Sequence, residues 1–68
     1  MFISFTENKN NMRDNAQRIS HSIDAIEDIK QVVPHFQWIN LFENMFSDEA
    51  GVNQIAQLLR NQLSNIEL

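Results

Sequence analysis

The longest periodic pattern of apolar residues covers positions 12–33. Its members are separated alternately by four and three positions, which is the roughly 3.5-residue repeat of a helix that turns one face toward a partner. Pro34 comes next, and a proline ring removes a backbone donor and disfavours helical angles at the preceding residue. We therefore predict a long heptad-patterned helix over 12–33. Its seam consists of Met12, Ala16, Ile19, Ile23, Ile26, Lys30 and Val33, of which only Lys30 is polar.

Two shorter helices are expected after the proline. Residues 35–46 predict an aromatic helix that is apolar on nearly all sides, and such a helix normally packs against its own chain and against something else. Residues 48–66 predict a third, amphipathic helix, because Ser47 or Asp48 can cap its first turn. The aromatic helix carries Phe36, Trp38, Ile39, Leu41, Phe42, Met45 and Phe46, and the amphipathic stripe consists of Val52, Ile55, Leu59, Leu63 and Ile66.

The start of the long helix has two interpretations. Ser4 with Glu7 fits a capping box, and so does Asn11 with Asp14. The segment 7–11 contains three asparagines, whose side chains compete with a helical backbone for hydrogen bonds. We therefore expect residues 1–11 to form a lead-in arm and the helix to begin at residue 12.

The expected fold class is all-α, with residues 1–68 as a single helical domain. A chain of 68 residues buries a small fraction of its surface and usually needs reinforcement. The chain has no cysteine, so disulfides and thiolate metal sites are excluded. Self-association is the remaining way to stabilise so small a domain. We expect a small helical bundle completed by homodimerisation, with about four to six helices in the dimer.

Composition and charge exclude several function classes. With 43% hydrophobic residues, one Gly and one Pro, the chain is too apolar and too unbroken for a disordered tail. A net charge of −4 with five Lys and Arg residues disfavours nucleic acid as a partner. No apolar run approaches the roughly 20 residues of a membrane span. The opening segment lacks the basic stretch of a signal peptide, so we expect no membrane association and a cytoplasmic protein.

The sequence offers little for catalysis. It contains no cysteine, no Gly-x-Ser-x-Gly turn and no glycine-rich phosphate loop. His21, Asp24 and Asp28 could share a helical flank with the spacing of a divalent metal site, but a solvated acidic face is the simpler interpretation. We expect no enzymatic activity, no metal and no cofactor.

Residues 42–62 offer a DNA-binding alternative. The segment Ala50-Gly51-Val52, with Asn53 and Gln54 after it, resembles the turn and recognition helix of bacterial helix-turn-helix repressors. The resemblance covers about a dozen residues and loses register beyond them. Arg60 is the only basic residue on the supposed recognition helix, where phosphate contacts would govern affinity. A transcription regulator is therefore the second hypothesis.

The first hypothesis is a small acidic module that binds proteins without catalysis, as an adaptor, inhibitor, chaperone-like or antitoxin-like regulator acting through a helical surface. A further alternative is a structural subunit of a larger assembly. The expected partners are a copy of the chain itself and another protein. Trp38 is the expected anchor, since tryptophan is enriched in energetic hot spots. The residues expected at the interface are Ile19, Ile23, Ile26, Phe36, Trp38, Phe42, Met45, Leu59 and Leu63.

Overall fold

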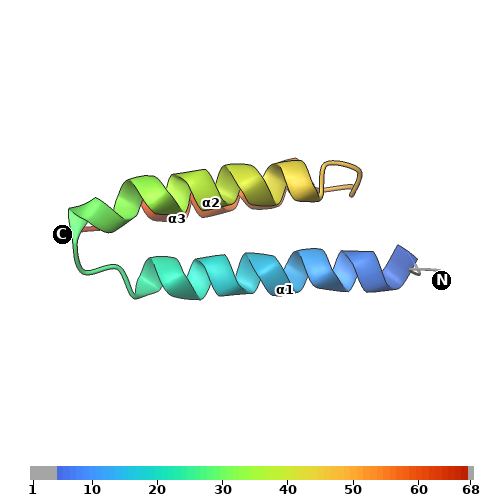
Figure 1. Ribbon diagram of the computed structural model, residues 1–68, viewed down its shortest axis with the longest axis horizontal. Coiled ribbons are helices and arrows are strands. Elements are labelled where there is room, and N and C mark those ends of the chain that lie inside the picture. The colour runs from blue at the N-terminus through green and yellow to red at the C-terminus, as the bar shows by residue number, and fades with distance from the viewer. Residues whose placement is uncertain (1–4, 68) are drawn as a thin grey trace.

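Three helices lie along one long axis in the computed structural model, which describes residues 5–67, with side chains from residue 9 onward (Figure 1). They are α1 (Phe5–Asp24), α2 (Val32–Met45) and α3 (Val52–Ser64), and the short 3₁₀ helix η1 (Ile29–Gln31) precedes α2. α2 runs back along α1, and α3 runs in the direction of α1. Each helix packs against the other two. Residues 5–67 contain no strand, so the prediction of an all-α fold is confirmed.

α1 begins earlier than the sequence pattern predicted. Residues 5–11 belong to the helix, so the prediction of a lead-in arm is wrong for this part, while residues 1–4 lie outside the described residues. Asparagine lowers helix stability by only a few tenths of a kcal/mol per residue, and extending an existing helix needs no new nucleus. The Asn15 side chain also donates to the Asn11 carbonyl at 2.8 Å. These asparagines are therefore tolerated within the helix.

α1 ends at Asp24, well before the predicted end at Val33. A capping box at the start of η1 explains the break. The Asp28 carboxylate accepts from the Lys30 N–H at 2.9 Å, and the Gln31 side chain accepts from the Asp28 N–H at 3.1 Å. These bonds satisfy backbone donors that a new helix would otherwise leave unpaired.

Pro34 lies in the first turn of α2, so the prediction that it ends the preceding helix is wrong. In a first turn the backbone N–H has no partner within the helix, and the fixed φ of proline suits the helical conformation. α2 therefore begins before Pro34, at Val32, instead of at residue 35.

The turn between α2 and α3 depends on Gly51. Its φ of 87° is the only positive φ among residues 5–67, and glycine adopts this left-handed conformation without the steric cost of a Cβ atom. α3 begins directly after it at Val52 and ends at Ser64. These bounds lie inside the predicted range of 48–66.

The core lies between the three helices and draws on all of them. Its largest fully buried side chains are Phe42, Ile19, Ile23 and Ile39. Of the predicted seam, Ala16 is partly buried, and Lys30 and Val33 are exposed. The buried members of the core are Met12, Ile19, Ile23, Ile26, Ile39, Phe42, Phe46, Val52, Ala56, Leu59 and Leu63.

Candidate interaction surface

α2 has an apolar row whose members, apart from one that packs partly against the core, are exposed. We define the outer face of α2 as Pro34, Trp38, Leu41 and Met45, which are separated by four, three and four positions. At about 100° per residue, these four share one side of the helix. Leu41 is 63% and Met45 68% exposed, Pro34 is exposed and Trp38 is partly buried. The row therefore leaves a contiguous apolar stripe on the surface.

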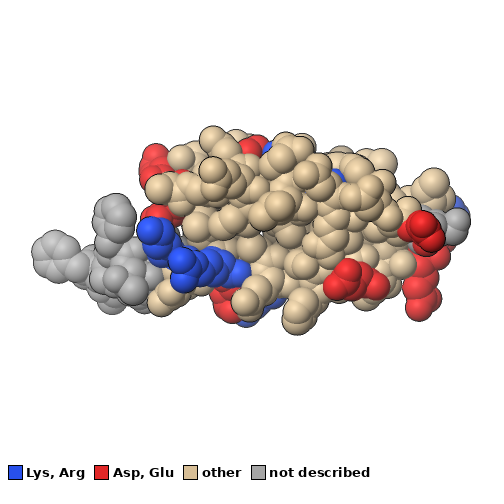
Figure 2. All heavy atoms as spheres, turned by 180° about the vertical axis from the view of Figure 1, so that it is seen from behind, with Lys and Arg blue, Asp and Glu red and all other residues tan. Residues whose placement is uncertain are grey.

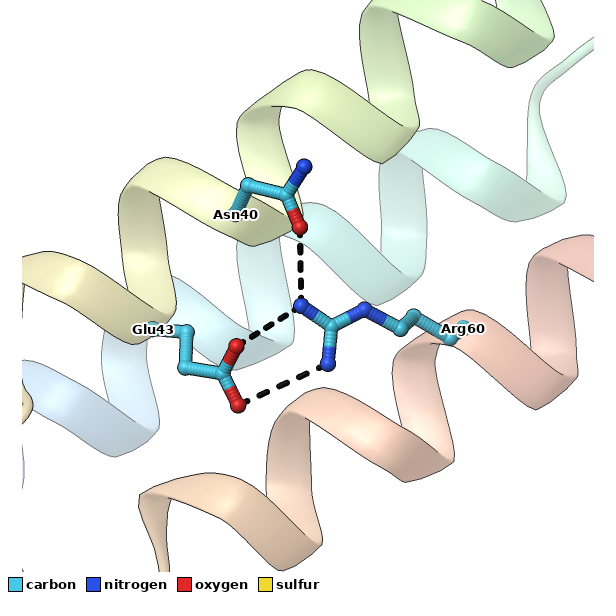
Figure 3. Close-up of polar contacts among 3 residues, drawn as sticks. All are labelled: Asn40, Glu43 and Arg60. Atoms are coloured by element: carbon cyan, nitrogen blue, oxygen red, sulfur yellow. Dashed lines mark hydrogen bonds and ion pairs between the residues drawn. The ribbon is translucent and has the colours of Figure 1, made fainter.

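Where α2 meets α3, on another side of α2 from this face, lies an ion-pair cluster (Figure 3). The Arg60 guanidinium donates to the Glu43 carboxylate at 2.8 Å and to the Asn40 side-chain oxygen at 2.8 Å. The hydrogen bond from Arg60 is the main reason that the pKa of Glu43 lies below its ordinary value. Desolvation raises this pKa to a lesser extent, and the Arg60 charge lowers it by a still smaller amount. Glu43 is the only Asp, Glu, Lys or Arg residue in α2. The one acidic side chain of α2 therefore forms an ion pair within the same chain.

His35 lies at the border of the outer face of α2 toward α1. Its Nδ1 atom lies 2.6 Å from the Gln31 carbonyl oxygen, and its Nε2 atom lies 2.7 Å from the Ser22 hydroxyl. A carbonyl oxygen can only accept, so in the neutral ring Nδ1 donates to Gln31 and Nε2 accepts from Ser22. The ring also lies 5.9 Å from that of Trp38, between centroids. Both ring nitrogens are engaged in contacts that join α2 to the preceding elements.

The predicted interface residues fall into two groups. Phe36 and Trp38 are partly buried against the core, and Met45 is largely exposed. The other six are at most 8% exposed and offer no surface to a partner while this fold is kept. These six are Ile19, Ile23, Ile26, Phe42, Leu59 and Leu63.

Sequence reasoning missed Leu41 as a surface residue. It shares the outer face with Trp38 and Met45, so the signal was the regular spacing of these residues around an all-round apolar helix. Three other large apolar side chains that are exposed lie outside the defined face: Ile29 in η1, Val33 in α2 and Leu58 in α3.

The suspected metal ligands do not converge. In the part of the chain that the structure describes, no three His, Asp or Glu side chains come together as a metal site would require. Asp24 instead accepts from the Gln62 side chain at 2.9 Å, and Asp28 caps η1. His21 is exposed on α1.

The segment suspected of binding DNA forms an antiparallel helical hairpin. α2 and α3 both follow the long axis of the molecule (Figure 1), whereas the helices of a helix-turn-helix cross at about 90–120°. Arg60, the one basic residue of α3, is bound to Glu43. No observation at this segment favours a DNA interface.

Comparisons with known proteins do not add an identity. No protein-family model matches the chain, and no curated protein or solved structure matches it. Within residues 5–67, none of the helices has the length and apolarity that crossing a membrane requires. The outer face of α2 is thus the feature on which a functional argument can rest.

Proposed function

We propose that this protein is a non-enzymatic interaction module that forms a homodimer through the outer face of α2. In this proposal it acts as a small adaptor, inhibitor, chaperone-like or antitoxin-like regulator by presenting helical surfaces to other proteins. The observation that carries the proposal is the exposed apolar row around Leu41 and Met45, which are 63% and 68% exposed. Single exposed apolar residues are normal, but a contiguous apolar patch usually marks an interaction site.

Charge supports a second copy as the occupant of this face. The chain carries a net charge of −4, so most ways of joining two copies bring acidic groups together. The outer face of α2 has no ionisable residue, and Glu43, the only Asp, Glu, Lys or Arg residue in α2, is paired with Arg60 at 2.8 Å. Two copies can therefore meet there without burying an unpaired charge or bringing like charges into contact.

The size of the face sets the expected affinity. α2 has 14 residues and is about 21 Å long. A single helix face of this length is smaller than the roughly 800 Å² that each partner contributes to a standard interface. We therefore expect a dissociation constant on the order of micromolar.

Light scattering behind a sizing column tests the proposal. The chain is measured over about a hundredfold range of concentration around 1 μM to 100 μM. We expect the mass to rise from monomer to dimer in the wild type. Leu41→Glu should remain monomeric throughout, because dimerisation would bury its charge twice in an apolar interface.

The matched control is Gln54→Glu, which adds the same charge at an exposed position on α3 and should dimerise like the wild type. Circular dichroism shows whether both variants keep the helical fold. A wild type that stays monomeric, or a dimer that Leu41→Glu leaves intact, would contradict the proposal.

A further inference from the structure

The spacing of the residues on the outer face of α2 is the same when counted from either end of the helix. Its four residues are separated by four, three and four positions. Two copies can therefore align in parallel or antiparallel orientation, and in both each of the four residues lies opposite one of the four residues of the other copy. Antiparallel alignment sets Pro34 opposite Met45 and Trp38 opposite Leu41. Parallel alignment sets each residue opposite itself.

Side-chain size distinguishes the two alignments. Large and small side chains alternate across well-packed interfaces, because facing layers then interdigitate without voids or overlap. The antiparallel alignment sets the Trp38 ring against the smaller Leu41, and the flexible Met45 against the compact Pro34. The parallel alignment would set two Trp38 rings against each other at one level and two prolines at another. The antiparallel alignment therefore offers the better steric match.

Charge along the molecule distinguishes them as well. The segment from Asp24 to Gln31 contains three acidic residues and one lysine, and Figure 2 shows acidic side chains grouped at the end that holds this joint. The opposite end has both signs, with Lys9 and Arg13 in α1 and two acidic residues in the turn before α3. A parallel dimer would bring the two acidic joints together.

An antiparallel dimer separates these joints by at least the length of α2, about 21 Å. Charges in physiological salt are largely screened beyond about 8 Å. The repulsion between the acidic joints is therefore removed by the antiparallel alignment and retained by the parallel one.

From these two observations we infer that the partner of the outer face is a second copy of this chain with its α2 helix antiparallel, so that Pro34 of one copy lies opposite Met45 of the other. The inference rests on the self-pairing proposed above and specifies its geometry. The two-fold axis then passes between Trp38 and Leu41, and the two acidic joints lie at opposite poles of the dimer.

Single-cysteine variants test the alignment cleanly, because the chain has no cysteine of its own. Pro34→Cys and Met45→Cys are each placed in a glutathione redox buffer, alone and then mixed, and the disulfide-linked species are identified by mass spectrometry. A disulfide forms only where two Cα atoms come within about 4.4–6.8 Å. We expect the mixed disulfide to exceed each symmetric disulfide by about tenfold, a preference of about 1.4 kcal/mol in free energy.

The control is Gln54→Cys on the exposed side of α3. It should form mixed disulfides with Pro34→Cys and with Met45→Cys to the same extent. Symmetric disulfides in each variant alone would establish a parallel dimer and overturn the inference, while the proposed self-pairing would stand. A dimer by light scattering that links neither position would place the interface elsewhere and overturn the inference. A monomer at every concentration would overturn the proposed function as well.

Discussion

The two faces of α2 carry the same kinds of side chain in opposite surroundings. Ile39 and Phe42 on the inner face are 0% and 2% exposed, whereas Leu41 and Met45 on the outer face are 63% and 68% exposed. Phe42 and Leu41 are neighbours in the sequence, and only the helical rotation of about 100° per residue separates their environments. The difference shows that the number of apolar residues sets how much apolar surface requires burial. The position of each residue around the helix determines whether the same chain can bury it.

The largest expected effect comes from truncating the inner face. Phe42→Ala should lower the free energy of unfolding by about 3–5 kcal/mol, because it removes buried aromatic surface and leaves a cavity. At roughly 0.05–0.15 kcal/mol per residue, a domain of this size has only about 3–10 kcal/mol in total, so much of the variant should be unfolded at 25 °C.

Leu41→Ala, one position away on the outer face, should change the free energy of unfolding by less than about 0.5 kcal/mol. Urea unfolding followed by circular dichroism checks both variants at a protein concentration below the dimer range. A loss for Leu41→Ala as large as that for Phe42→Ala would show that the outer face is packed within the monomer, and the comparison would fail.

A smaller effect is expected at the turn that sets the inner face of α2 against α3. Gly51→Ala should lower the free energy of unfolding by about 1–2 kcal/mol, because an L-residue pays a steric penalty in the left-handed region. An added Cβ atom would meet no heavy atom within 4 Å, so the backbone conformation alone causes the loss.

Thermal unfolding measures this effect, since 1 kcal/mol corresponds to about 4–8 °C in Tm for a small domain. Gly51→Asn is the matched variant and should lose less, because asparagine visits this region more readily. Dimerisation of the folded Gly51→Ala variant should match that of the wild type. An equal loss for both substitutions would contradict the backbone explanation.

A further effect, which depends on pH, is expected where α2 meets α3. The hydrogen bond from Arg60 lowers the pKa of Glu43 from its ordinary value of 4.5. A carboxyl whose pKa is lower in the folded state stabilises the fold above its unfolded pKa. This contribution shrinks as the pH falls below about 4.5 and is lost once the pH passes the lowered pKa of the folded state.

Glu43→Gln should therefore be less stable than the wild type near neutral pH, and the difference should disappear in acid. Urea unfolding between about pH 7 and pH 3 checks this. Asp14→Asn is the control, because Asp14 pairs with Arg18 at 3.7 Å with side chains 66% and 73% exposed. A difference for Glu43→Gln that persists unchanged at the lowest pH would contradict the assigned cause.

Helix periodicity predicted the all-α class and the rows of apolar residues, but it did not locate the break after α1. The reason lies in Ile26, which is 8% exposed although it follows the end of α1. The chain turns there while the Ile26 side chain stays in the core, so the periodic pattern continues into a joint that is not α-helical. The signal for the break was polar, in the capping pair of Asp28 and Gln31.

Periodicity also did not predict which apolar rows would remain on the surface. Ile19 and Leu59 are buried by helices of the same chain, and nothing in the spacing of their rows distinguishes burial by the same chain from burial by a partner. Trp38 and Met45 were predicted at an interface because α2 is apolar on nearly all sides. The structure leaves Met45 exposed, and whether a partner covers it stays a prediction.

Trp38 is the only tryptophan, and the chain has no tyrosine. Nearly all of the near-ultraviolet fluorescence of the protein therefore comes from one indole ring, which is partly buried against the core and belongs to the outer face of α2. A second chain that covered this ring would move its emission to shorter wavelengths without any label. The molecule thus carries its own optical probe at the surface where its partner is expected.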